Sequence, residues 1–207
     1  MNLSVTSTGR CTVEAMPIEM VERKGLGHPD TICDNVAEQL SRALSAYYLE
    51  RSGRILHHNV DKALLVGGQA KPRFGGGEII EPIRLILAGR ATTVVRTEDG
   101  DHHVPVGYLA IKAARAWLRQ NIPDLPDEGV VIDYQIRPGS DDLREVVEKS
   151  RSHVPEANDT SLGVGHAPLS RTERIALEVE KAVREIEPIG PDVKVMALRY
   201  NLSLIHI

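Results

Sequence analysis

The sequence is short of cysteine and has no excess of positive charge. Its 207 residues include two cysteines, Cys11 and Cys33, and carry a formal net charge of −4. Cys33 falls on the apolar side of a predicted helix, so a buried free thiol is favoured over a disulfide or metal site, and no redox chemistry is implied. Without a basic excess, a general nucleic-acid binder is disfavoured, although a local basic pocket for a small anion is compatible with this charge.

Long hydrophobic runs are also missing. The N-terminal segment has no basic stretch followed by an apolar one, and no later segment approaches the roughly 18 apolar residues of a membrane span. We therefore expect a cytoplasmic protein with no membrane partner. A hydrophobic content of 42% in 207 residues is enough for the buried core of one large domain or two small ones.

An amphipathic helix is predicted to begin at Pro29. Proline suits the first helical position, where its missing N–H costs no hydrogen bond, and the residues that follow have a helical period. An acidic stripe lies roughly opposite the apolar one. The apolar stripe comprises Ile32, Val36, Leu40, Leu44 and Tyr47, and the acidic stripe comprises Asp30, Asp34 and Glu38.

The order of the remaining elements favours an α+β fold over a doubly wound one. Short apolar runs separated by glycine and proline predict an antiparallel or mixed sheet after the first helix, and Asp99-Gly100 predicts a hairpin. The other expected elements are a helix over about 108–118, an alternating strand over 130–136, a short helix from about Asp141, and a long helix after the capping-box pair Ser170 and Glu173.

The segment around Asp30 suits phosphate and a divalent cation. Taken alone, an aspartate in a first helical turn is explained by the helix dipole, an interaction worth ~0.3–1 kcal/mol. However, Gly25 and Gly27 let backbone approach a ligand, His28 brings a titratable nitrogen, and a helix N-terminus favours anions. An aspartate oxygen is also a ligand that Mg²⁺ prefers. The combination favours a site for phosphate and magnesium.

Three other segments have weaker signals. The stretch RPGSDD, Arg137 to Asp142, lies between a strand and a helix, where nucleotides often bind, but its one glycine fits a simple turn equally well. The stretch ANDTSLGVGHAPLS, residues 157–170, is either a functional loop or loose surface. The stretch KPRFGGGE lacks the Gly-Lys-Ser/Thr ending of a P-loop.

Six segments, taken in order, closely resemble the archaeal-type S-adenosylmethionine synthetases, or methionine adenosyltransferases. They are VERKGLGHPDTICD, LHHNVDKALLVGG, FGGGEIIEPI, GSDDL, ANDTSLGVGHAPLSRTER and PDVKVMALR. The resemblance implies a fold of layered helices and mixed or antiparallel sheets. It implies an enzyme that forms S-adenosylmethionine from ATP and L-methionine and releases phosphate and diphosphate. It also implies Mg²⁺, allows K⁺, and suggests a homodimer or higher homo-oligomer at full length.

The resemblance further implies roles for three residues at the triphosphate. The methionine sulfur is a neutral nucleophile that needs no base, so the enzyme's task is to orient the reactants and to stabilise a highly charged leaving group. His28 would donate toward the phosphates, Asp30 would hold Mg²⁺, and Lys194 would reach the phosphates.

Other residues are implied for binding ATP or substrate. Asp192 would help to fix the nucleoside, Asp159 would lie against the adenosyl and methionine groups, and Asp61 would contact the methionine ammonium. Pro138 departs from the expected Gly-x-Gly-Ser pattern and removes one N–H donor. The other implied binding residues are Arg137, Gly139, Ser140, Asp141, Asp142 and Asn158.

The length of the chain also departs from the family, whose members continue well past this point. We expect a truncated reading frame whose product has little activity alone. We place a first sheet-and-helix domain at 1–125, a partial second domain with the nucleotide and substrate loops at 126–201, and a non-native tail, LSLIHI, at 202–207.

Two alternative functions are a magnesium-dependent phosphohydrolase and a non-catalytic fragment or subunit. A hydrolase would need a water-activating base or a second carboxylate cluster, and the sequence shows one acidic stripe.

Overall fold

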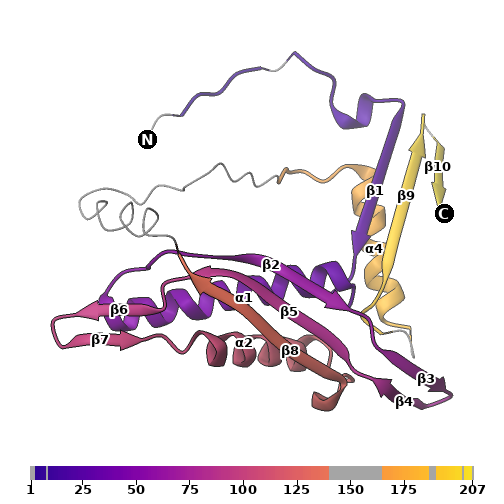
Figure 1. Ribbon diagram of the computed structural model, residues 1–207. Helices are drawn as coiled ribbons and strands as arrows, with labels where there is room; N and C mark the ends of the chain where they lie inside the picture. The colour runs from indigo at the N-terminus through magenta and orange to yellow at the C-terminus, as the bar shows by residue number, and fades with distance from the viewer. Residues whose placement is uncertain (1–2, 8, 140–164, 187–189, 202, 207) are drawn as a thin grey trace. The chain divides into compact units, whose positions relative to one another are not determined.

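The computed structural model describes residues 3–7, 9–139, 165–186, 190–201 and 203–206. Its contacts divide the chain into two compact units. The terminal unit combines Met1–His28 with Gly163–Ile207, and the central unit is Pro29–Leu162. Figure 1 shows the elements of both.

In the terminal unit, strands from both ends of the chain form one antiparallel sheet. After a short 3-10 helix, η1 (Val13–Ala15), strand β1 (Ile18–Lys24) pairs with β9 (Lys194–Tyr200), whose other edge pairs with β10 (Ser203–His206). Helix α4 (Arg171–Arg184) packs against β1 and β9 (Figure 1). The core between helix and sheet consists of Ala176, Val193, Val195 and Ala197.

The predicted capping box begins α4. The Ser170 hydroxyl oxygen accepts a hydrogen bond from the Glu173 N–H at 3.1 Å, and the Glu173 carboxylate accepts one from the Ser170 N–H at 2.7 Å. Two of the N–H groups that a helix start leaves unpaired are thereby satisfied, which explains why the helix begins here.

The central unit contains a three-stranded mixed sheet in the order β2-β5-β8. Strand β5 (Ile83–Ala91) pairs antiparallel with β2 (His58–Val66) and parallel with β8 (Val130–Pro138). Helix α2 (Val106–Asn121) lies in the long crossover that a parallel pair requires and is followed by a 3-10 turn, η2 (Asp127–Gly129). The predicted helix at 108–118 and strand at 130–136 are thus confirmed.

Two hairpins extend this unit. Strands β3 (Gln69–Arg73) and β4 (Gly76–Glu81) form one, and β6 (Val94–Thr97) and β7 (Gly100–His103) form the other. The second hairpin turns at Glu98 and Asp99, one residue before the predicted Asp99-Gly100 pair, and Gly100 begins β7. Gly100 has a φ of +121°, a conformation that residues with a side chain rarely adopt.

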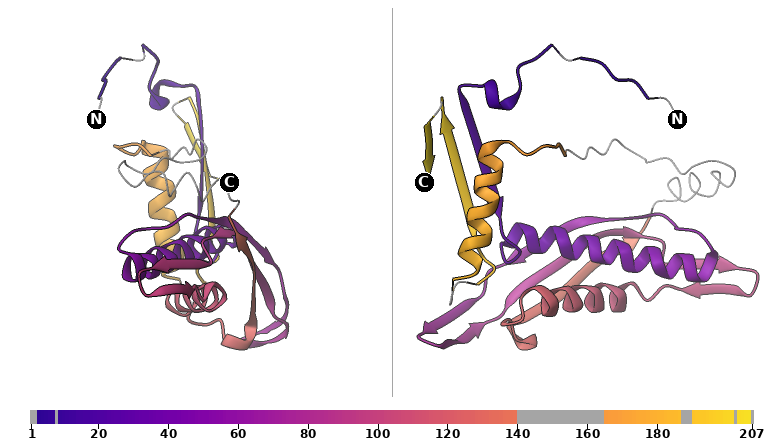
Figure 2. Two further views of the ribbon diagram at one scale, coloured as in Figure 1. Left: turned by 60° about the vertical axis from the view of Figure 1, so that its left-hand side comes forward. Right: turned by 180° about the vertical axis from the view of Figure 1, so that it is seen from behind.

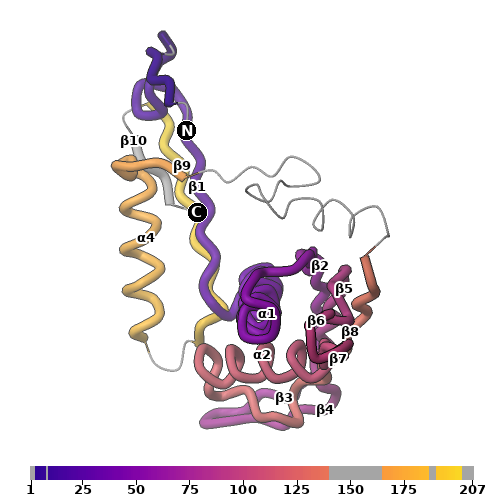
Figure 3. Tube along the Cα trace, turned by 90° about the vertical axis from the view of Figure 1, so that its left-hand side faces the viewer, coloured from indigo at the N-terminus to yellow at the C-terminus, as the bar shows by residue number. Residues whose placement is uncertain are grey.

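Helix α1 (Pro29–Ser52) begins at the predicted proline and packs against β2 and α2. Figures 2 and 3 show α1 and α2 beside each other, covering one face of the β2-β5-β8 sheet. The buried apolar stripe ends at Tyr48, one helical turn after Leu44, so the prediction of Tyr47 at this position was wrong. Tyr48 is fully buried and donates a hydrogen bond to the Thr92 carbonyl at 2.7 Å, which satisfies its hydroxyl.

The α+β fold class is confirmed. Both cysteines are free thiols, with Cys11 exposed and Cys33 partly rather than fully buried.

The sequence predicts a domain boundary near residue 125, and this stays a prediction. In the described chain, β8 follows residue 125 and pairs with β5 inside the central unit. The predicted short helix from Asp141 lies outside the described residues. Among those described, none of the helices has both the length and the apolar character to cross a membrane.

Candidate functional site

The turn that joins β1 to α1 lies against the start of β9. The Gly25 N–H donates to the Val193 carbonyl at 2.7 Å, and the Gly27 N–H donates to the Pro191 carbonyl at 2.9 Å. A Cβ at Gly25 would lie 2.6 Å from the Pro191 oxygen, and one at Gly27 would lie 2.6 Å from the Asp192 nitrogen. The described structure thus requires both glycines for close approach of the chain to itself.

This junction brings together three of the predicted residues. His28 ends the turn and is partly buried, and its N–H donates to the Gly25 carbonyl at 3.1 Å. Asp192 is exposed two residues before Lys194, which is exposed at the first position of β9. The positive nitrogen of Lys194 and the ring of His28 therefore come from segments that the β1–β9 pairing holds next to each other.

Glu22, a residue that the sequence reasoning missed, holds the Lys194 side chain. Their charged groups are 2.8 Å apart, and Lys24, the residue opposite Lys194 in the β1–β9 register, is 3.4 Å from the same carboxylate. The hydrogen bond from Lys194, aided by Lys24, lowers the pKa of Glu22. The sequence contains Glu22 and Lys194, but it does not show that they pair, because the pairing depends on the register of β1 with β9.

Asp30 is an exposed carboxylate in the first turn of α1, where the helix dipole favours negative charge. Among the described residues, no group of three or more His, Cys, Asp or Glu side chains could hold a metal ion by itself. Magnesium usually binds through one or two carboxylates, several waters and the phosphates of its substrate. Asp30 therefore suits an ion that arrives with a polyphosphate rather than one held in a cage of side chains.

Asp61 lies in an irregularity of β2, where the register with β5 shifts between Asn59 and Lys62. Its carboxylate is 62% exposed and accepts two hydrogen bonds of 2.9 Å from Lys62, which lower its pKa. Gly89 faces this irregularity, since a Cβ there would lie 2.2 Å from the Asn59 carbonyl oxygen. The close approach fixes the path of the backbone that carries Asp61.

The predicted nucleotide segment begins at the end of β8. Arg137 is exposed and lies beside Arg90 in the parallel β5–β8 register, and Arg90 donates to the Pro138 carbonyl at 3.1 Å. Gly139 is buried, and a Cβ on it would lie 3.2 Å from Nδ1 of His57. Burial, with a smaller contribution from His58, lowers the pKa of His57.

Arg90 and His57 are thus further contacts of this segment that the sequence reasoning missed. Arg90 pairs with Asn59 on its other side, so the sheet brings the segments of Asp61 and Arg137 to one end. The other predicted residues lie outside the described ones, namely Ser140, Asp141, Asp142, Asn158 and Asp159.

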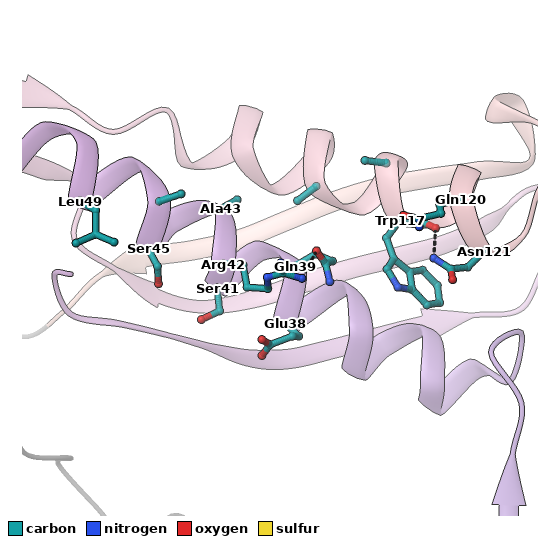
Figure 4. A pocket seen from close by; sticks show the side chains of 13 residues that line it. Glu38, Gln39, Ser41, Arg42, Ala43, Ser45, Leu49, Trp117, Gln120 and Asn121 are labelled. Atoms are coloured by element: carbon teal, nitrogen blue, oxygen red, sulfur yellow. Dashed lines mark hydrogen bonds between the residues drawn. The ribbon is translucent and has the colours of Figure 1, made fainter. Parts of the chain in front are cut away.

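A separate cleft of about 910 Å³ lies between α1 and α2 (Figure 4). Its walls carry Glu38 and Arg42 from α1 and Trp117 and Asn121 from α2. None of the predicted site residues is among those that line it. The cleft is therefore separate from the residues predicted from the sequence.

Comparisons with known proteins match nearly the whole chain. The family model for S-adenosylmethionine synthetase (AdoMet synthetase) matches residues 1–205. An S-adenosylmethionine synthase from Aeropyrum pernix is 53% identical over 199 residues, which cover 93% of this chain and 49% of the relative. Those from Caldivirga maquilingensis and Saccharolobus solfataricus are 51% and 49% identical, with 96% of this chain covered in each case and 51% and 50% of the relatives. The chain spans about half the length of these relatives.

Proposed function

Because the chain belongs to the S-adenosylmethionine synthetase family, we propose that it carries part of the machinery of a methionine adenosyltransferase. The reaction joins the methionine sulfur to C5′ of ATP and breaks the bond from C5′ to the triphosphate oxygen. The released tripolyphosphate is then hydrolysed to phosphate and diphosphate. The observation that carries this proposal is the β1–α1 junction, which places His28 and Lys194 on adjacent segments and is followed directly by Asp30 at a helix start.

The leaving group explains the choice of residues. Negative charge grows on the triphosphate as the C5′–oxygen bond breaks, so fixed cationic and hydrogen-bonding groups stabilise the transition state more than the ground state. In this proposal Lys194 exchanges Glu22 for phosphate oxygens, and His28 donates to the same group. Asp30 would hold Mg²⁺, which neutralises phosphate charge when bound.

The central unit would supply the other substrate contacts. Asp61 is exposed and negatively charged, which suits the methionine ammonium, and Arg137 and Gly139 lead into the proposed nucleotide segment. The remaining proposed contacts with nucleotide or methionine are Asp192, Pro138, Ser140, Asp141, Asp142, Asn158 and Asp159. We further propose a homodimer or higher homo-oligomer in the cytoplasm, and K⁺ as an additional cofactor.

A chimera tests the proposed activity. Residues 1–201 are joined to the part of the Aeropyrum pernix relative that this chain does not cover, and S-adenosylmethionine is measured with ATP, L-methionine and Mg²⁺. We expect methionine-dependent S-adenosylmethionine, with phosphate and diphosphate as the other products. A folded chimera that releases phosphate from ATP without needing methionine would instead indicate a phosphohydrolase.

A further inference from the structure

A hydrogen-bonded serine and histidine join α1 to β2. The Ser41 hydroxyl oxygen lies 2.8 Å from Nε2 of His58, and Nδ1 of His58 lies 2.9 Å from the Leu56 carbonyl oxygen. A carbonyl can only accept, so Nδ1 carries the proton of the neutral ring. Nε2 is then the unprotonated nitrogen, and the Ser41 hydroxyl donates to it.

Ser41, His58 and the Leu56 carbonyl are arranged like the nucleophile, base and orienting group of an activated serine. A nucleophilic hydroxyl lies within hydrogen-bond distance of a base, and a third group orients that base. Ser45, one helical turn further along α1, is 3.5 Å from the same Nε2, at the limit for a hydrogen bond. Of the two hydroxyls, Ser41 therefore makes the shorter hydrogen bond to Nε2 of His58.

Ser41 also has access to space for a reactant. It lines the cleft between α1 and α2, together with Gln39 and Arg42. Figure 4 shows the Ser41 and Ser45 hydroxyls on one side of α1.

We propose that Ser41 is an acylation site that accepts acyl groups from activated carboxylic esters. The Ser41 oxygen attacks the acyl carbon and forms the new ester bond, while the bond from that carbon to the leaving oxygen breaks. Nε2 of His58 takes the hydroxyl proton and passes it to the leaving oxygen. The products are an O-acyl Ser41 and the free alcohol or phenol.

The test is acetylation of the 207-residue chain by p-nitrophenyl acetate, followed by peptide mapping with mass spectrometry. We expect acetyl on Ser41, at a rate well above that of Ser4, an exposed serine near the N-terminus. His58→Gln removes the base and should slow the reaction about 10²-fold, since general-base catalysis contributes about that much. Ser41→Ala should abolish labelling of this peptide, and the matched variant Ser45→Ala should leave labelling of Ser41 unchanged.

Unfolding supplies a test that needs no substitution. In urea, the labelling rate of Ser41 in the unaltered chain should fall to that of Ser4, because the pair with His58 no longer exists. Three results would overturn the proposal. The first is that Ser41 reacts no faster than Ser4 in the folded chain, and the second is that the acetyl group is found on Ser45. The third is that His58→Gln reacts at the unaltered rate while its circular dichroism melt shows a folded protein.

Discussion

Lys194 belongs to the terminal sheet and is also the proposed contact for the triphosphate. It is 45% exposed and paired with Glu22, a contact that solvent weakens, so moving the ammonium to a phosphate costs little. A phosphate bears more negative charge than a single carboxylate and competes well for this group. The exposed pair therefore leaves Lys194 available to a polyphosphate.

Replacing Lys194 tests this assignment in the chimera. Lys194→Met should lower kcat about 10²-fold or more, the usual cost of removing a group that stabilises transition-state charge. Lys24→Met is the matched control, because Lys24 lies opposite Lys194 and contacts the same carboxylate. Steady-state kinetics with varied ATP compare the two variants, and equal losses in both would contradict a specific role for Lys194.

Asp30 has two competing explanations that one substitution separates. If it binds Mg²⁺, Asp30→Asn in the chimera should leave folding intact while magnesium-dependent formation of S-adenosylmethionine collapses. If it only complements the helix dipole, the loss is ~0.3–1 kcal/mol of stability with activity largely kept. Turnover against magnesium concentration, paired with a melting curve and with His28→Ala as a second site variant, decides between the two.

Among the elements, α4 is tied to the terminal sheet in part through a buried carboxylate of β1. Glu19 of β1 is 6% exposed and accepts hydrogen bonds from Ser170, from Thr172 at 2.7 Å and from Arg199 of β9 at 3.1 Å. Burial alone would raise the pKa of Glu19, but these three donors together outweigh it and lower the pKa. Helix and sheet are thus joined by a charge that is fully hydrogen-bonded.

The stability of the terminal unit should therefore depend on Glu19 and on pH. Because its pKa is lower in the folded state, Glu19 contributes stability above its unfolded pKa, and this is lost as the pH falls through the folded value. Glu19→Gln should cost about 1–3 kcal/mol at neutral pH, the penalty for leaving buried partners unsatisfied. Urea titrations at neutral and acidic pH measure both effects. Glu22→Gln, an exposed glutamate on the same strand, should change little.

The β1–α1 turn depends on glycine for packing. Gly27→Ala places a Cβ against the backbone at Asp192, so the turn must move away from β9 at a cost of about 1–3 kcal/mol. Gly67→Ala is the control, because nothing lies within 4 Å of a Cβ there. Thermal melts of both variants test this, and an unchanged melting temperature for Gly27→Ala would mean that the close contact is absent in solution.

At the scale of the whole molecule, the chain spans about half the length of its relatives. A triphosphate leaving group needs more cationic and hydrogen-bonding groups than His28 and Lys194 provide, and each 1.36 kcal/mol of lost transition-state stabilisation is about tenfold in rate. We therefore predict little or no S-adenosylmethionine from the 207-residue chain under conditions in which the chimera is active. Comparable rates in a quantitative product assay would show that this chain alone suffices.

The sequence by itself determined the local features of this protein. Pro29 starts a helix because its own ring sets the backbone angle, Ser170 and Glu173 cap a helix because they are three residues apart, and a hairpin turns directly before Gly100 because glycine accepts positive φ. Each signal lies within a few residues. The α+β class and the resemblance to a family were accessible for the same reason, since both rest on short segments read in order.

Only the tertiary structure decided how distant segments meet. The pairing of β1 with β9 joins residues more than 150 positions apart, and its register alone brings Lys194 to Glu22 and the Gly25 turn to the start of β9. Likewise, the hydrogen bond from the buried Tyr48 hydroxyl to the Thr92 carbonyl joins α1 to a distant segment. Strand register and buried hydrogen bonds depend on packing between elements, which no local pattern encodes.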